Sequence, residues 1–370
     1  MTVRESGPLA DVHVVELAAY MSAPFAAMML ADLGASVTKV ESPKGDPYRR
    51  FRGARTAMSP QFANINRNKT SVIADLKDLA GQARVRELLR DADVLLTNLR
   101  PATARRLGLD DEALAAANPK LIRCWVTGFG TDGPDADRPA YDPIIQAQAG
   151  MTQTWGDSDH PAIAPNFLAD GIAASMNVQA ILAALYARQR TGLGERIDAA
   201  MLDAVSYFSF PTAMAHRTLL DHQPPGPDNP DKAPIRPIAA SDGWLIVGPV
   251  TRDQIRGSCA AVGHPEWAEE LMAAHPMSQL SYPLLDRLET VTRTAPTSQW
   301  LEAFAKHDVP AARCLSAEEH FEDPQVRYNE LYSIEPWPDL GPVRQARYPA
   351  RYGSWPHLGV RRPAPAVGES

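Results

Sequence analysis

The order of the hydrophobic segments in the first half of this chain is the feature that most restricts its fold. Short runs rich in β-branched residues alternate with longer stretches that have the apolar spacing of amphipathic helices. This alternation is typical of βαβ units, in which helices join parallel strands and cover the sheet. The expected strands are residues 12–17, 36–41, 71–76, 93–98 and 121–126, with helices at 24–33 and 81–90. The pattern predicts an α/β fold with a Rossmann-like, mostly parallel sheet.

Two long helix patterns follow, at residues 170–190 and 196–220. The proline-rich stretch 222–230 cannot continue a helix and is predicted to be a linker. Beyond it, a strand at 244–247 and several helices indicate a smaller α+β unit. The tail is rich in proline, which favours an extended arm packed on another surface, although such a composition is also common in disordered tails.

These patterns predict three segments. The first, residues 1–221, is the large domain, and the second, residues 222–315, contains the linker and the small domain. We expect the third segment, residues 316–370, to return to the large domain as a C-terminal arm.

Composition excludes several classes of function. The formal net charge of −7 argues against a nucleic-acid-binding surface, which needs an excess of basic residues. The longest apolar stretch, residues 21–35, contains Asp32 and is too short to span a membrane. Cys124, Cys259 and Cys314 are far apart and odd in number, as expected for thiols in a reducing compartment. We therefore expect a cytoplasmic protein without nucleic-acid or membrane partners.

One motif resembles a dinucleotide-binding loop but lacks its context. Residues 128–133 match the glycine fingerprint, yet the proline-containing segment 134–139 stands where the helix of such a loop must begin. A turn is the better interpretation. The nine histidines show no metal-ligand spacing, so no metal site is predicted.

Basic residues gather at two places that follow predicted strands. The first group is Lys39, Lys44, Arg49, Arg50, Arg52, Arg55, Arg67 and Lys69, and the second is Arg100, Arg105 and Arg106. Ligands of open α/β sheets bind at the carboxyl ends of the strands, and positive charge there suits a ligand that bears phosphates. A solvated basic face is the alternative for the first group.

A single carboxylate, Asp170, stands directly before the first long helix pattern. An aspartate at this position can cap the helix, and its charge lies at the positive end of the helix dipole. Such a carboxylate stays ionised and accessible, as a nucleophile must. From the residues alone, helix capping is the simpler role.

Residues 141–150 and 169–174 and seven further segments form a recognisable set along the chain. The seven are residues 15–18, 23–26, 30–41, 45–47, 66–71, 98–101 with 106–108, and 192–195. In these segments, and over nearly its whole length, the chain resembles the family III CoA-transferases, the group of carnitine and formyl-CoA transferases.

The resemblance implies roles for individual residues. Asp170 occupies the position of the family's nucleophile, and Tyr141 that of a hydroxyl which contacts the substrate carboxylate. A packed aromatic is the alternative for Tyr141. The remaining implied contacts are to CoA, which is a substrate here and not a permanently bound cofactor. The CoA contacts are Asn98, Arg100 and Arg106, with Lys69, Thr70, Ser71, Tyr20 and Met21 near the pantetheine and the thioester.

The implied reaction moves CoA from an acyl-CoA to a free carboxylic acid. Asp170 attacks the thioester to form an aspartyl anhydride, which the released thiolate converts to an aspartyl-CoA thioester. The acceptor acid then reverses these two steps. The resemblance also implies a homodimer of interlocked rings, in which each chain threads the other.

Two other functions share the implied fold. An α-methylacyl-CoA racemase would need a histidine where Tyr141 stands and a glutamate where Ala239 stands. Tyrosine, with an ordinary pKa of ~10, is a poor base for removing an α-proton. A non-catalytic CoA-binding protein would not need Asp170. CoA transfer is therefore the preferred function.

The sequence restricts the acyl group only loosely. Several large residues are expected near the thioester, and they favour an acyl group larger than formyl. They are Tyr20, Met21, Phe51, Tyr141 and Trp155. Arg49 and Arg138 are candidates for pairing with a second carboxylate on the substrate. Ser42 stands where the formyl/oxalate branch has an arginine, so the contacts to adenine are expected to differ.

Overall fold

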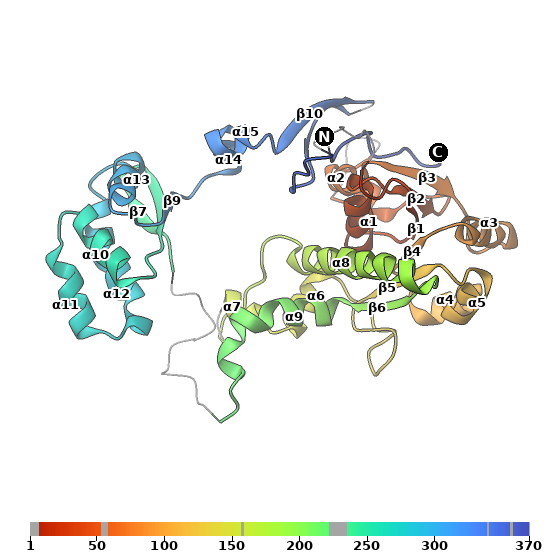
Figure 1. The fold of residues 1–370 in the computed structure, drawn as a ribbon, viewed down its shortest axis with the longest axis horizontal. Helices are drawn as coiled ribbons and strands as arrows, with labels where there is room; N and C mark the ends of the chain where they lie inside the picture. The colour runs from red at the N-terminus through yellow and green to blue at the C-terminus, as the bar shows by residue number, and fades with distance from the viewer. Residues whose placement is uncertain are drawn as a thin grey trace. The chain divides into compact units, whose positions relative to one another are not determined.

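A computed structural model describes residues 7–52, 58–156, 159–221, 235–338, 340–355 and 358–369 (Figure 1). The chain divides into two compact units. The larger comprises Met1–Pro224 together with Glu330–Ser370, and the smaller is Pro225–Asn329.

The large unit is built on one parallel sheet. Its described strands are β1 (His13–Leu17), β2 (Ser36–Glu41), β3 (Lys69–Ile73), β4 (Val94–Thr97), β5 (Ile122–Thr127) and β6 (Arg196–Ala200). They lie in the order β3-β2-β1-β4-β5-β6, and each neighbouring pair is parallel. This is the strand order of the Rossmann fold. The predicted α/β class and parallel sheet are confirmed.

Helices cover both faces of this sheet. Alternate strand residues point to opposite sides, so Val14 and Leu96 join one core while Val15 and Leu95 join the other. The first core is shared with α1 (Ser22–Asp32), α6 (Asp142–Gln148), α8 (Leu168–Thr191) and α9 (Met201–Ala213). The second is shared with α3 (Leu79–Arg90), α4 (Pro101–Leu107) and α5 (Asp111–Ala117).

The helix predicted at residues 196–220 was wrong in its first part. Residues Arg196–Ala200 form the edge strand β6, which pairs with β5 from Arg123 to Thr127. The two alanines of this segment favour a helix, but pairing with an exposed sheet edge prevails over local propensity. Helix α9 begins only at Met201 and ends at Ala213, followed by a short 3-10 turn, η2 (Ala215–Arg217).

Helix α8 is the long central helix of the unit, and it lies beside α9 in Figure 1. It begins at Leu168, so Asp170 lies within its first turn, whereas the sequence predicted a cap before the helix. By length and composition, α8 is the one described helix that meets the criteria for crossing a membrane. Its packing against α1, α6 and β5 identifies it as a core helix.

Shorter elements complete the large unit. They are η1 (Pro47–Arg50), α2 (Pro60–Asn66) and α7 (Met151–Trp155). Residues 128–133 form bends that lead into a turn at 134–137, and the next helix, α6, begins only at Asp142. The glycine fingerprint is therefore not followed by the helix of a dinucleotide-binding loop, as predicted.

The small unit has an antiparallel sheet, β7 (Ile238–Ala240), β8 (Gly243–Val247) and β9 (Ala311–Arg313), in that order. Its helices are α10 (Arg252–Ala261), α11 (Glu266–Ala274), α12 (Ser281–Thr292), α13 (Thr297–Lys306), α14 (Ala317–Glu322) and α15 (Pro324–Tyr328), with the 3-10 turn η3 (Met277–Gln279). Leu245, Trp300 and Phe304 belong to a separate apolar core. The arrangement matches the predicted α+β unit.

The segment boundaries differ from the predicted ones. Residues 316–329 were assigned to the arm, but they belong to the small unit. An ion pair of 2.9 Å between Arg313 and Glu319 joins β9 to α14. The part of the tail that belongs to the large unit starts at Glu330 and contains a hairpin of β10 (Tyr332–Trp337) and β11 (Gly341–Ala346).

The last described residues bind to the edge of the parallel sheet. Asn68 accepts hydrogen bonds from the N–H groups of Arg361 and Arg362, at 2.7 and 3.0 Å, and donates to the carbonyl of Gly359 at 2.6 Å. At Ser71, the N–H donates to the carbonyl of Glu369 at 2.7 Å. Residues 66–71 thus hold the end of the chain against β3.

Candidate active site

The site begins where the strand order of the sheet reverses, between β1 and β4. Ligands of Rossmann-like sheets bind at this point. The side chain of Asn98, which follows β4, donates to the carbonyl of Ala19 at 2.8 Å and accepts from its N–H at 3.2 Å. Asn98 therefore fixes the turn that follows β1, and it also lines the adjoining pockets.

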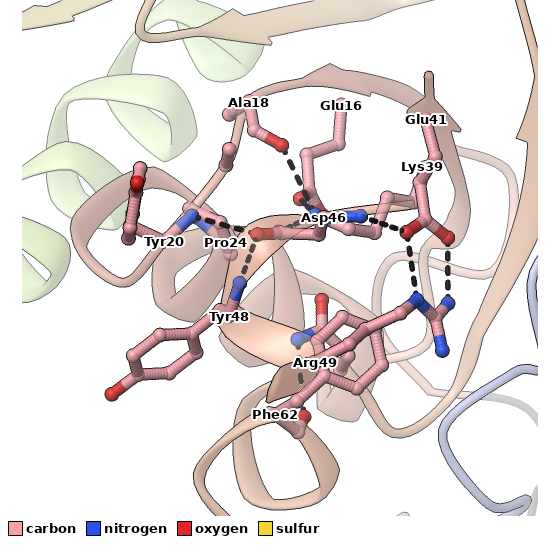
Figure 2. Close-up of polar contacts among 12 residues, drawn as sticks. Glu16, Ala18, Tyr20, Pro24, Lys39, Glu41, Asp46, Tyr48, Arg49 and Phe62 are labelled. Atoms are coloured by element: carbon pink, nitrogen blue, oxygen red, sulfur yellow. Dashed lines mark hydrogen bonds and ion pairs between the residues drawn. The ribbon is translucent and has the colours of Figure 1, made fainter. Parts of the chain in front are cut away.

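A buried cluster of charges lies behind this turn (Figure 2). The Lys39 ammonium contacts the Glu16 carboxylate at 2.6 Å, the Asp46 carboxylate at 2.9 Å and the carbonyl of Ala18 at 3.0 Å. The other Glu16 oxygen contacts the Lys69 ammonium at 2.7 Å. Lys69 also donates to the carbonyl of Pro24, so strands β1, β2 and β3 and the start of α1 are joined at one point.

Lys69 was predicted near the thioester, and its position does not support that role. Its side chain is fully buried, and it donates to Glu16, Pro24 and Asn66. Burial lowers the pKa of Lys69 to about 8, opposed by the charge of Glu16. Burial alone would raise the pKa of Glu16, but Lys39 and Lys69 hold it below its ordinary value. Lys69 therefore belongs to the frame of the site.

A second buried pair anchors the segment after β2. The Arg49 guanidinium binds the Glu41 carboxylate through two nitrogens, at 2.6 and 2.8 Å, and lies 3.9 Å from the centre of the Phe62 ring (Figure 2). Ser71 donates its hydroxyl to the same carboxylate at 2.5 Å. Arg49 and Ser71 are thus occupied inside the protein. These contacts do not support the roles expected from the sequence, and CoA contact by Ser71 and substrate pairing by Arg49 stay predictions.

The first basic group is therefore mostly structural. Lys39, Arg49, Arg67 and Lys69 are buried and paired with carboxylates, because each closes a contact between segments of the large unit. Lys44, Arg50 and Arg52 are exposed, and Arg55 lies outside the described residues. The half-buried Thr70 donates its hydroxyl to the carbonyl of Val37 at 3.2 Å. In the second group, Arg100, Arg105 and Arg106 are all exposed.

Asp170 lies between the ends of two helices and a second carboxylate. Asp142, at the start of α6, accepts a hydrogen bond of 2.9 Å from the backbone N–H of Asp170. The backbone N–H of Ser22, at the start of α1, donates to the Asp170 side chain. The Ser22 hydroxyl is buried, lines the same pocket and makes no hydrogen bond to a described residue.

This environment raises the pKa of Asp170 to about 7. Burial is the main cause, the Asp142 charge adds to it, and the hydrogen bond from Ser22 opposes both. The sequence predicted a carboxylate kept ionised by the helix dipole. Desolvation outweighs that dipole, so Asp170 titrates near neutral pH.

Aromatic side chains form one wall beside Asp170. The rings of Tyr20 and Tyr141 meet edge to face at 5.5 Å, and Tyr20 lies 6.5 Å from Tyr48. Hydrogen bonding to Tyr141 raises the pKa of Tyr20, so this phenol keeps its proton. Tyr48 donates its hydroxyl to the Met21 sulfur at 3.7 Å. The structure thus brings Tyr20, Met21 and Tyr141 together at Asp170.

Three pockets adjoin one another along this region. One of about 300 Å³ lies beyond the ends of β1, β2 and β4 and shares Ala19 and Asn98 with the next. The second, about 270 Å³, contains Asp170, Ser22, Tyr20, Tyr141 and Arg100. Met21 is shared with the third, which measures about 880 Å³ and is mainly apolar. We call the third pocket the acyl chamber.

Sequence reasoning missed Asp142 and Ser22. A weak signal was present for Asp142, which precedes Pro143 at the start of a helix pattern, as Asp170 precedes its own. The contact between these two segments is tertiary, so spacing along the chain did not show it. Ser22 acts through its backbone N–H, which leaves no trace in the residue type.

A family model described as CoA-transferase family III matches residues 9–370. The chain belongs to CoA-transferase family III. It is 35% identical to a succinate–glutarate CoA-transferase of Agrobacterium fabrum, over 98% of this chain and 93% of that protein. It is 33% identical to a succinyl-CoA–D-citramalate CoA-transferase of Chloroflexus aurantiacus, over 99% and 92% of the two chains.

Solved structures agree with this membership. A CaiB/BaiF family protein from Brucella suis superposes with a TM-score of 0.83 at 32% identity, covering 99% of this chain and 97% of that one. The predicted family and the CoA-transferase class are confirmed. No group of metal-ligating side chains occurs in the described parts of the chain.

The position of Asp170 has a consequence for stability. Its pKa is about 7 in the folded protein and near 3.8 when unfolded, so the folded state holds more protons between these values. Stability therefore falls as pH rises through this window. Asp170→Asn removes the penalty. We expect its free energy of unfolding in urea to exceed the wild-type value by up to about 4 kcal/mol at pH 8, and to match it at pH 3.5.

The exposed Asp137→Asn is the matched control, because it removes a charge without relieving burial. A stability difference between Asp170→Asn and wild type that stays constant from pH 3.5 to pH 8 would contradict the raised pKa.

Proposed function

We propose that the protein transfers CoA from an acyl-CoA thioester to a free carboxylic acid, with Asp170 as the covalent nucleophile. The observation that carries this proposal is a desolvated carboxylate at the junction of a pocket beside the sheet switch point and an apolar chamber. A carboxylate removed from water is a stronger nucleophile than one at the surface, because no hydration shell has to be displaced.

The proposed reaction has four steps and needs no external proton. An Asp170 oxygen attacks the thioester carbonyl, the C–S bond breaks, and CoA leaves as thiolate, giving an aspartyl anhydride. The thiolate then attacks the Asp170 carbonyl carbon and expels the donor acid, giving an aspartyl-CoA thioester. The acceptor carboxylate attacks that thioester and releases the thiolate. Finally the thiolate attacks the acceptor's acyl carbon and frees Asp170.

The three pockets suit the parts of this substrate. The small pocket at the strand ends has the position of a nucleotide site in Rossmann-like sheets, and Lys77 lines it. Asn98 lines both this pocket and the next, where Arg100 is available to a phosphate. Arg106, exposed on α4, remains a predicted phosphate contact. The pantetheine thiol would then reach Asp170 beside Tyr20 and Met21.

The tetrahedral intermediates need donors for their oxyanions. The backbone N–H of Gly171 donates to the carbonyl of Phe167 and is therefore occupied. The Ser22 N–H already donates to the Asp170 side chain, so it is placed to stabilise the oxyanion that forms when the Asp170 carbonyl carbon is attacked. We propose it as one donor and the unpaired Ser22 hydroxyl, which lies beside the same pocket, as the other. A Cβ at Gly171 would meet no atom within 4 Å, so open space lies beside the nucleophile.

The role of Asp170 is tested by Asp170→Ala. We expect the exchange of CoA between acids to fall by at least about 1,000-fold, since the nucleophile is lost. The affinity for CoA, measured by calorimetry, should change little, because the proposed CoA contacts are elsewhere. Hydroxylamine added to the wild type should give a hydroxamate at Asp170 only when acyl-CoA is present.

Asp137→Ala removes an exposed carboxylate and should behave as wild type. Full turnover in Asp170→Ala would refute the nucleophile. In deuterated water, exchange at C2 of a 2-methylacyl-CoA that depends on Asp170 would instead support racemase chemistry.

We further propose that the acyl group ends in a second carboxylate. Charged side chains lining the acyl chamber, within the described ranges, are Arg52 and Asp142, and Asp142 already accepts two hydrogen bonds. Arg52 makes no ion pair with a described carboxylate. The earlier candidates are occupied, Arg49 by Glu41 and Arg138 by Asp135. The relatives named for succinate, glutarate and citramalate agree with a short dicarboxylic acid.

Arg52→Asn tests this substrate class. Asn is neutral and tolerates the positive φ of 52° at this position. We expect kcat/KM for succinyl-CoA to fall by about 10- to 100-fold, the usual effect of losing a charged hydrogen bond. With butyryl-CoA, of equal chain length, activity should not fall.

The exposed Arg50→Asn on η1 is the control, because Arg50 is not among the residues that line the chamber. Equal losses for succinyl-CoA and butyryl-CoA in Arg52→Asn would show that Arg52 does not read a second carboxylate.

We also propose that the protein is a homodimer, which is predicted to be of the interlocked-ring type, and that it acts in the cytoplasm. Helix α9 supports association, because Tyr207, Phe208 and Phe210 are 74%, 55% and 48% exposed. Such a concentration of aromatic surface is typical of an interface. Light scattering should give twice the 40.3 kDa chain mass at micromolar concentration. A monomeric mass would contradict the dimer.

A further inference from the structure

A buried chain of hydrogen bonds connects the nucleophile to the wall of the acyl chamber. The N–H of Ala164 donates to Gln146 Oε1 at 2.9 Å, and Gln146 Nε2 donates to Asp142 Oδ1 at 2.5 Å. The other Asp142 oxygen accepts the N–H of Asp170 at 2.9 Å. Asp142 and Gln146 are 2% and 0% exposed. We call Asp142 and Gln146 the relay.

The backbone N–H groups at the two ends of the relay determine which of its atoms donate and which accept. The two backbone N–H groups can only donate, so acceptors must face them. Gln146 therefore turns its oxygen toward Ala164 and its NH₂ toward position 142, which must accept at both oxygens. The two oxygens of Asp142 fulfil this requirement. An asparagine at position 142 would turn an NH₂ group toward the NH₂ group of Gln146.

The relay joins three segments that otherwise contact the substrate separately. Ala164 and its neighbours Ile163 and Pro165 line the acyl chamber, and Asp142 lies at the start of α6. Asp170 lies in the first turn of α8. The wall that would hold the acyl group and the carboxylate that would attack it are thus held at a fixed separation by buried hydrogen bonds.

Resting on the proposed role of Asp170, we propose that Asp142 is a positioning residue for the nucleophile. Through the relay it fixes the first turn of α8 against the chamber wall, and its charge adds to the effect of burial on the Asp170 carboxylate.

The charge of Asp142 also favours the covalent states. Two neighbouring carboxylates repel each other while Asp170 is free and ionised. Once Asp170 is acylated or joined to CoA, it carries no charge and the repulsion disappears. Asp142 therefore destabilises the resting carboxylate more than the intermediates, which lowers the barrier to acylation.

Other groups near Asp170 do not duplicate this role. Its pocket is lined by Tyr20 before α1, by Arg100 after β4, and by Arg138 and Tyr141 before α6. Burial raises the pKa of Tyr48 of η1 to about 12, and the nearby Asp170 charge adds to the shift. Helices α1 and α9 contribute the uncharged side chains Ser22 and Met201, and Arg52 lines the adjoining chamber. None of these groups is acidic, so Asp142 is the one acidic neighbour of Asp170 among the residues named here.

The test uses Asp142→Asn and the double variant Asp142→Asn/Gln146→Glu. The single variant removes the charge and breaks the relay. In the double variant, the new amide NH₂ at position 142 donates to the new carboxylate at position 146, which also accepts from Ala164, so each hydrogen bond is restored. The carboxylate charge is then one residue further along the relay from Asp170. Circular dichroism and thermal melting establish that each variant is folded.

The measurement is kcat/KM against pH with the donor and acceptor pair that the wild type turns over fastest. In Asp142→Asn, the acid limb should move to lower pH by about 1 unit or more, and kcat at pH 8 should fall by about 10- to 100-fold. The double variant should regain most of kcat while its acid limb stays below that of the wild type. If Asp142→Asn does not fold, the acid limb of the double variant alone carries the test.

Two results would overturn the proposal. One is an acid limb that does not move in a folded variant, and the other is a double variant no faster than Asp142→Asn. Asp170→Asn, assayed in parallel, separates this failure from that of the proposed function. Retained turnover in Asp170→Asn would refute the role of Asp170 as nucleophile. If Asp170→Asn loses turnover but the acid limb of Asp142→Asn does not move, only the role of the relay is refuted.

Discussion

The contact of one carboxylate, Glu16, with two buried ammonium groups is the interaction on which the large unit depends. Lys39 and Lys69 come from neighbouring strands, and each also binds backbone carbonyls of the turn after β1 or of α1. Removing one member would leave an unpaired charge in the core, which typically costs about 3–5 kcal/mol. The cluster selects one arrangement of these segments, because only in that arrangement does each buried charge have a partner.

The cluster positions the active site by fixing the turn at residues 18–22. The cluster holds the turn from behind, Asn98 holds it from the side, and Asp46 accepts the N–H of Tyr20 at 3.3 Å. The turn then presents the Ser22 N–H to Asp170. The carboxylates of Glu16 and Asp46, which form ion pairs, thus stabilise the turn. Asp170, which forms no ion pair with a described residue, is the carboxylate that the turn contacts on the side of the pocket.

The sheet and the position of Asp170 at the start of a long helix were predictable, because both leave local signals. Strand and helix periodicities indicated the parallel sheet, and Asp170 stands at a helix start within a recognisable segment. The buried lysine and arginine side chains were not predictable, since a basic residue after a strand looks alike whether it binds phosphate or Glu16. The partner of Lys69 lies more than fifty positions earlier in the chain, and only the folded sheet brings them together. The raised pKa of Asp170 likewise depends on burial and on the charge of Asp142, and both arise only in the folded protein.

The attachment of residues 358–369 to Asn68 and Ser71 affects the order of events during synthesis. Strand β3 leaves the ribosome well before residues 358–369, whose backbone groups satisfy its outer edge. Until they emerge, the nascent large unit exposes an incomplete sheet edge, the kind of surface on which chains aggregate. Residues 358–369 thus complete the sheet edge only after the rest of the large unit has been synthesised, so substitutions in this segment should affect aggregation during folding more than the stability of the folded protein.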